Sequence, residues 1–279
     1  MTPQEKKQLQ VMACKVRMGV IEGVHAAKSG HPGGSLSAAD MFTYLYFKEL
    51  RVDPKNPQWE DRDRFVLSKG HTAPGLYATL ALRGFFPVED LVTLRKMGSY
   101  LQGHPNMNTV PGVDMSTGSL GQGASTAAGA ALGNKIDGRT NHVFCVVGDG
   151  EADEGQVWEA FHFAYAHKLD NLIYIIDNNG YQLDGKTADI LDHGDIAKKA
   201  EGFGLYTQEI DGHDVEAIYQ AIQNAYDKKG VPSCIVLDTI KGKGATFAEP
   251  KREHSSQPSE EAWQEAIAAA EKTLEEVRK

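Results

Sequence analysis

The sequence predicts an α/β fold: a single doubly wound domain over 1–279, with a mostly parallel central sheet and helices on both faces. Two continuous apolar runs, 143–147 and 172–176, are typical of strands buried on both faces. A helical segment from about Glu154 to His167 lies between them, so the three form a right-handed β-α-β unit. No internal repeat, low-complexity segment or clear linker divides the chain.

The chain is expected to open with a helix over 3–28, which serves as peripheral cover. Thr2 can cap it, Pro3 suits its first position, and Glu5 completes a capping box. The segment 29–35 is expected to be a loop, because a proline and three glycines stop a helix.

The elements on either side of the β-α-β unit follow from the same periodicity. Before it, we expect a helix over 38–50, a short strand over 65–67 and a helix over 74–82. A glycine-rich loop and a helix of very small residues occupy 116–133. After the unit, the sequence predicts a helix, a third buried strand and a charged tail helix, at 214–229, 234–237 and 259–277.

The composition excludes two classes of partner and favours one compartment. The chain has 38 Asp and Glu residues and 29 Lys and Arg residues, which gives a formal net charge of −9. This negative charge argues against binding to nucleic acid or to an anionic membrane surface. The three cysteines lack CxxC spacing, which favours a reducing compartment. No run reaches the ~20 apolar residues of a transmembrane helix, and the start has no apolar signal segment. We therefore expect a cytoplasmic protein.

Polar residues follow the two buried strands of the β-α-β unit. The first strand ends at the turn 148–150, which contains Asp149, and the second ends shortly before Asn179. Because the carboxyl ends of parallel strands meet at one edge of a sheet, we expect these two side chains to lie close together. Carboxylate and amide oxygens suit Mg²⁺ or Ca²⁺. The glycines and the helix that follows suit a phosphate, so the pattern predicts a metal-bridged diphosphate. Either turn alone is common in proteins, whereas the pair with a helix and strand between them is not.

These residues resemble the thiamine diphosphate motif, in which Gly-Asp-Gly is followed by Asn-Asn. Other segments resemble transketolase and occur in transketolase order, so that the resemblance extends from about residue 5 to 258. These segments are SGHPG at 29–33, RFVLSKGH at 64–71, GHP at 103–105, TGSLGQG at 117–123 and DGHD at 211–214.

The resemblance implies an enzyme that transfers a two-carbon ketol unit from a ketose phosphate to an aldose phosphate by means of thiamine diphosphate. It also implies that half of the enzyme is missing, because transketolases are usually more than twice this long. The chain resembles the N-terminal subunit of a split transketolase. A C-terminal subunit would carry the pyrimidine-binding domain and its glutamate, in an α₂β₂ assembly.

The family's functional residues carry over by position. The metal ligands would be Asp149, the Asn179 side chain and the Tyr181 carbonyl. The residues expected to contact the cofactor are His71, Gly118, Ser119, Leu120, Gly148, Asp149, Gly150, Glu154, Asn179 and His254. The histidines expected to act in catalysis are His31, His71, His104 and His254. Glu154 and Glu159 match acidic residues of a subunit contact beside the cofactor.

Other functions remain open at this point. The segment 241–244 leans towards a 1-deoxyxylulose-5-phosphate synthase-like enzyme, whereas His31, His71 and His104 together favour transketolase. A subunit of a 2-oxo acid dehydrogenase E1 and a non-catalytic thiamine diphosphate-binding module are further alternatives. The sequence does not name the sugars, so unusual donors such as sulfo-sugars or branched pentuloses stay open.

Overall fold

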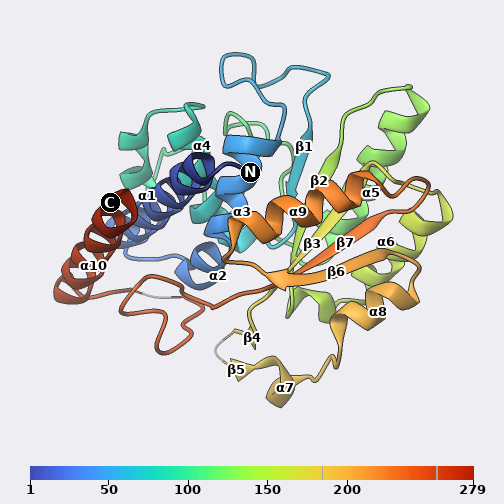
Figure 1. Cartoon of the computed structure of the whole chain (residues 1–279). Helices are drawn as coiled ribbons and strands as arrows, with labels where there is room; N and C mark the ends of the chain where they lie inside the picture. The colour runs from blue at the N-terminus through green and yellow to red at the C-terminus, as the bar shows by residue number, and fades with distance from the viewer. Residues whose placement is uncertain (184, 256) are drawn as a thin grey trace.

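The computed structural model describes residues 1–183, 185–255 and 257–279. Within them, five strands form one sheet in the order β1-β2-β3-β7-β6, and every neighbouring pair is parallel (Figure 1). The strands are β1 (Arg64–Leu67), β2 (Val143–Gly148), β3 (Leu172–Asn178), β6 (Tyr206–Asp211) and β7 (Ser233–Asp238). This sheet confirms the predicted fold class.

Helices cover both faces of the sheet, so the central strands are buried on both sides. On one face lie α1 (Pro3–Ala27), α3 (Ala39–Tyr44), α4 (Ala73–Arg83) and α9 (Val215–Tyr226). On the other lie α5 (Gln122–Ile136), α6 (Gly155–Ala166) and α8 (Ile196–Gly202). Along β2, Phe144 and Val146 pack on the first face, whereas Val143 and Cys145 pack on the second. This alternation on two apolar faces explains why the sequence of β2 is apolar throughout.

The segment expected to be a loop at 29–35 instead contains the start of a short helix, α2 (Pro32–Ser37), so that part of the prediction is wrong. A proline stops a helix from its interior but suits its first position, where the missing N–H has no helical partner. The two glycines of α2 are needed for close packing. A Cβ on Gly33 would lie 2.0 Å from the carbonyl oxygen of Glu253. The helix expected over 38–50 is α3, extended by a π-helical turn over Leu45–Glu49.

The remaining elements lie at the edges of the sheet and at the ends of the chain. The tail helix α10 (Glu260–Arg278) packs against α1, where the ring of Trp263 stacks on His25 with centroids 4.3 Å apart. Short elements are η2 (Gly70–Thr72), η3 (Val88–Thr93), η4 (Glu151–Asp153), β4 (Tyr181–Gln182), β5 (Gly185–Lys186) and α7 (Thr187–Ile190). In the part of the chain that the structure describes, no helix combines the length and the apolar character needed to cross a membrane.

Candidate functional site

The ends of β2 and β3 bring the two polar turns together. Gly148 and Asp177 are register partners at the end of the two strands. The carboxylate of Asp149 accepts hydrogen bonds from the backbone N–H groups of Gly150, at 2.9 Å, and Gly180, at 2.7 Å. One buried carboxylate therefore joins the turn that follows β2 to the turn that follows β3.

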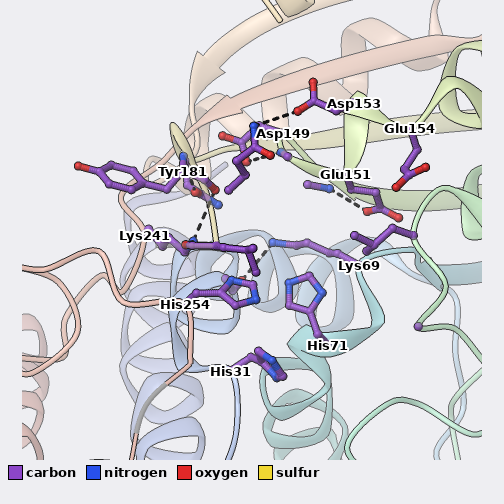
Figure 2. Close-up of a pocket in the computed structure, with 18 of the residues that line it drawn as sticks. His31, Lys69, His71, Asp149, Glu151, Asp153, Glu154, Tyr181, Lys241 and His254 are labelled. Atoms are coloured by element: carbon purple, nitrogen blue, oxygen red, sulfur yellow. Dashed lines mark hydrogen bonds between the residues drawn. The ribbon is translucent and has the colours of Figure 1, made fainter. Parts of the chain in front are cut away.

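A cavity of about 630 Å³ opens at this edge of the sheet (Figure 2). Its lining includes the predicted site residues His31, His71, His104, Gly118, Leu120, Gly148, Asp149, Gly150, Glu154, Asn179, Tyr181 and His254. Ser119 is not among the lining residues. Its side chain is exposed, and its carbonyl accepts a 3.3 Å hydrogen bond from the N–H of Gln122 at the start of α5.

A buried ion pair lies next to Asn179, one of the predicted metal ligands. Asp177 is fully buried and pairs with the ammonium of Lys69. It also accepts 2.6 Å hydrogen bonds from the hydroxyls of Ser37 and Thr239, and one of 3.2 Å from the amide of Asn179. Burial alone would raise the pKa of Asp177, but Lys69 and these hydrogen bonds bring it below its usual value. Asp177 is therefore an ionised anchor that holds the Asn179 side chain.

The pKa of Asp149 is shifted in the opposite direction. Its side chain is almost fully buried, and that burial, together with the neighbouring charge of Asp177, raises the pKa of Asp149 to about 6. The two backbone hydrogen bonds oppose this rise but do not cancel it. A carboxylate in such a place is stabilised by any cation that binds beside it.

Oxygen atoms suited to a hard cation line the same cavity, in the turn after β3 that this carboxylate contacts through the Gly180 N–H. The side-chain oxygen of Asn179 faces the backbone of Tyr181, whose N–H donates to it at 3.2 Å. The buried ammonium of Lys241 points at the carbonyl oxygens of Tyr181, at 3.5 Å, and Leu183 (Figure 2). A carboxylate, an amide oxygen and a backbone carbonyl match the preference of Mg²⁺ or Ca²⁺. No cluster of three His, Cys, Asp or Glu side chains suited to a metal occurs among the described residues, and this donor set does not need one.

The loop that carries Lys241 is held in place by a half-buried histidine, His213. The Nε2 atom of His213 accepts a 2.9 Å hydrogen bond from the N–H of Ile240, and its Nδ1 atom lies 2.9 Å from Asp40. Asp40 is in turn paired with Arg17. This chain of contacts fixes the backbone directly before Lys241.

Three histidines from distant parts of the chain meet in the cavity. The ring centroids of His31, His71 and His254 lie 4.9–5.3 Å apart. Burial is the main reason why the pKa of His31 falls to about 4 and that of His71 to about 2. His104 packs against Gly118, whose φ of 149° and close approach exclude a side chain, since a Cβ there would lie 2.9 Å from the imidazole. Burial lowers the pKa of His104 as well. His31, His71 and His104 are therefore neutral at pH 7.

Several residues of the site were not predicted from the sequence. Glu151 is buried and accepts hydrogen bonds from the Ser68 hydroxyl at 2.5 Å, the Gly121 N–H at 2.9 Å and the Gly148 N–H at 3.0 Å. It thus joins three of the motif segments. Lys69, Asp177 and Lys241 were missed too, although Lys69 and Lys241 lie inside segments that the sequence singled out.

The fold and the cavity define a class: an α/β protein with a polar ligand cavity at the carboxyl ends of its parallel strands. The family model for the transketolase, thiamine diphosphate binding domain matches residues 8–273. The chain belongs to the transketolase family.

Similar proteins include two that have about the same length as this chain. It is 46% identical over 265 residues to a 6-deoxy-6-sulfo-D-fructose transketolase subunit of Clostridium sp. strain MSTE9, covering 95% of this chain and 96% of the relative. It is 36% identical over 272 residues to an apulose-4-phosphate transketolase subunit of Phocaeicola vulgatus, covering 97% and 96%. The solved transketolase of Campylobacter jejuni has a TM-score of 0.89 and 34% identity, over 97% of this chain but 43% of that one.

These comparisons confirm the prediction of a transketolase subunit with the thiamine diphosphate-binding part. They favour it over the synthase and dehydrogenase alternatives, since the relatives just described are transketolases or their subunits. Because two of them are named as subunits, a partner subunit is implied.

Proposed function

We propose that this chain binds thiamine diphosphate with Mg²⁺ and, together with a partner chain, transfers a two-carbon ketol unit from a ketose to an aldose. The observation that carries the proposal is the meeting of Asp149, Asn179 and four histidines in one cavity at the ends of β2 and β3. A cavity of about 630 Å³ is within the range of small-molecule and cofactor sites.

Asp149, the side-chain oxygen of Asn179 and the carbonyl of Tyr181 would hold the metal. The high pKa of Asp149 supports this role, because a cation stabilises its ionised form. Gly150 and Lys241 would hold the diphosphate. A Cβ on Gly150 would lie 2.6 Å from Gln182, so only glycine leaves this turn in place. The buried Lys241 ammonium supplies a positive charge that a diphosphate requires.

The cofactor, when bound, supplies the carbanion chemistry that breaks and forms the carbon–carbon bond. This chain's own contribution is to bind, orient and exchange protons. Neutral imidazoles can both donate and accept, so His31, His71 and His104 would hold the donor's hydroxyl groups and move protons between them. His254 completes the wall of the cavity at 4.9 Å from the His71 ring.

The partner would supply the rest of the site. We propose that it carries the pyrimidine-binding domain with the glutamate that pairs with the cofactor's ring, and that two copies of each chain assemble. Glu154, the N-cap of α6, and Glu159, within the same helix, are both exposed, where such a contact would lie. The substrates would be ketoses and aldoses with a terminal anion, as the names of the two subunit relatives indicate for them. The three free, buried cysteines fit a reducing compartment, so we place the complex in the cytoplasm.

The cofactor site is tested by calorimetric titration of the purified chain, with and without its partner, with thiamine diphosphate and Mg²⁺. Asp149→Ala is expected to weaken binding by more than about tenfold, because it removes a charged metal ligand. Asp227→Ala removes an exposed carboxylate at the end of α9 and is the control. Equal binding by wild type and Asp149→Ala would show that the metal site is wrongly assigned.

The reaction is tested by co-expression with candidate partner chains of about 300 residues, encoded next to this one. The complex should transfer a ketol unit from a ketose phosphate or sulfonate to an aldose and should not decarboxylate pyruvate. Decarboxylation of pyruvate without ketol transfer would favour the dehydrogenase class instead.

A further inference from the structure

Glu151 is a buried carboxylate in the cavity wall that has no part in the function proposed so far. It lines the cavity, is 3% exposed and directly follows the turn 148–150, which contains Asp149. Its Oε2 atom accepts a 3.0 Å hydrogen bond from the N–H of Gly148 at the end of β2. Glu151 is therefore attached to the turn that would hold the metal and the diphosphate.

The other carboxylate oxygen of Glu151 contacts two segments that are distant in the sequence. Its Oε1 atom accepts hydrogen bonds from the hydroxyl of Ser68 after β1, at 2.5 Å, and from the N–H of Gly121, at 2.9 Å. Gly121 is the N-cap of α5, has a φ of 81° and has no side chain with which to cap the helix. A carboxylate at the N-terminus of a 15-residue helix is stabilised by the helix dipole, so Glu151 also fixes the place where α5 begins.

The loop 117–121 faces the cavity between two anchors. At its first end, the hydroxyl of Thr117 donates a 2.6 Å hydrogen bond to the carbonyl of Leu67 in β1. At its other end, the loop is held by the carboxylate of Glu151. Gly118 and Leu120 line the cavity between these anchors, and Leu120 is 37% exposed. The loop therefore presents an apolar surface to whatever fills the cavity.

One side chain thus joins two walls of the cavity, the turn 148–150 and the loop 117–121. Figure 2 shows Glu151 on the opposite side of the cavity from Tyr181 and Lys241. A ligand that contacts the turn alone depends only on the turn's own geometry. A ligand that contacts both walls also depends on the distance between them, because its groups bind well only when each meets its partner in place.

We propose that Glu151 is a positioning residue: it fixes the distance between the turn 148–150 and the loop 117–121 and so determines the affinity for a cofactor that contacts both. This inference rests on the proposed function. Thiamine diphosphate carries its diphosphate at one end and its rings beyond it, so it would contact both walls. Inorganic pyrophosphate would contact the turn alone, which makes it the probe that separates the two contacts.

Glu151→Gln tests the link because it keeps the size of the side chain. An amide has one oxygen and one NH₂ group, so it accepts hydrogen bonds on one side only. On the other side it presents a donor to a buried backbone N–H, that of Gly148 or that of Gly121. One of the two walls therefore loses its attachment.

Glu49→Gln is the matched control, because Glu49 is another half-buried or buried carboxylate that accepts from neighbouring donors. It accepts hydrogen bonds from the hydroxyls of Tyr44, at 2.5 Å, and Tyr226, at 2.6 Å. The ring of Tyr226 contacts His142, which directly precedes β2, so this cluster lies at the opposite end of the strands from the cavity.

Calorimetric titration of the complete two-chain complex measures the Kd of thiamine diphosphate and that of pyrophosphate, each with Mg²⁺. Glu151→Gln is expected to raise the Kd of thiamine diphosphate about 10-fold, because a buried N–H loses its acceptor and the loop its place. The Kd of pyrophosphate should rise less than about threefold. In Glu49→Gln both Kd values should stay within about twofold, although its Tm falls.

Two further measurements test the link without the cofactor or without Glu151→Gln. In the apo complex, the amides of 117–123 should exchange hydrogen for deuterium faster in Glu151→Gln than in the wild type, and at the wild-type rate in Glu49→Gln. Ser68→Ala keeps the carboxylate but removes one of its donors, so it should raise the Kd of thiamine diphosphate about two- to threefold. This variant decides the question if Glu151→Gln does not fold.

Equal changes in the two Kd values, no change in either, or unchanged exchange of 117–123 in Glu151→Gln would overturn the role of Glu151 and leave the cofactor site in place. If only Ser68→Ala folds, an unchanged Kd of thiamine diphosphate overturns it. A wild-type complex that binds no thiamine diphosphate would overturn the proposed function itself, and this inference with it.

Discussion

Replacing Asp149 with asparagine should stabilise the protein in the absence of cofactor and abolish metal-dependent cofactor binding. The carboxyl is 1% exposed and has its pKa raised to about 6. At about 1.4 kcal/mol per pKa unit, its ionisation costs the folded chain about 3 kcal/mol at a pH well above 6. Asparagine removes this cost. It can accept only one of the two N–H groups from Gly150 and Gly180, which loses about 1 kcal/mol. The net gain is about 2 kcal/mol.

The sign of the pH dependence follows from the same pKa. Because the folded-state pKa of Asp149 lies above the unfolded one, folding is disfavoured by its ionisation above pH 6, and the penalty disappears as the pH falls below about 4. Urea unfolding of the apo proteins between pH 4 and 8 measures the difference, with Asp227→Asn as the exposed control. The reasoning is refuted if apo Asp149→Asn is no more stable than wild type at pH 7.5, or if its advantage does not shrink towards pH 4. Thiamine diphosphate with Mg²⁺ should raise the Tm of the wild type but not that of Asp149→Asn.

Three further changes test other parts of the structure. Gly123→Ala places a Cβ 2.6 Å from a backbone atom of the segment after β1, so it should lower the free energy of unfolding by about 1–3 kcal/mol. The Cβ of Gly129→Ala, on the same helix, meets nothing within 4 Å, so this variant should raise the free energy of unfolding by about 0.5–1 kcal/mol. Urea unfolding measures both changes. Lys69→Met leaves Asp177 buried without its counter-ion and should cost about 3–5 kcal/mol, part of which returns when Asp177→Asn is added. The low pKa of His31 means that its protonation opposes folding below pH 6.5. The wild type should therefore lose stability as the pH falls from 7 to 5, and His31→Gln should lose about 1 kcal/mol less over the same interval. The same urea unfolding curves measure this difference.

The parts of the fold that could be predicted are those in which burial leaves a mark on the sequence. The strands β2, β3 and β7 are covered on both faces, so their sequences are apolar without interruption. The edge strand β6 is half-exposed and reads YTQEID, which carries no such signal, and it was missed. The start of α2 was missed because a proline and glycines are ambiguous. They end one helix, and the same proline begins the next.

The candidate site was predictable as far as topology alone determines it. Parallel strands must place their carboxyl ends at one edge, so the approach of Asp149 and Asn179 follows from the order of elements. The pairing of Lys69 with Asp177 does not follow from the order of elements, because charged residues are usually exposed and these two are 108 positions apart. The contact of Arg95 with His31, just outside the cavity lining, could not be predicted either, because it depends on a single left-handed residue in an irregular turn.

The charges of the cavity oppose the charge of the chain as a whole. With a net charge of −9, the protein repels sugar phosphates and sulfonates at long range. Their binding must therefore rely on cations within a few ångströms, where screening by salt is weak. Lys69 is neutralised by Asp177, whereas Lys241 lies near the proposed metal site and Arg95 lies beyond the histidines. Two cations at two ends, with neutral imidazoles between them, suit a ligand that carries negative charge at both ends.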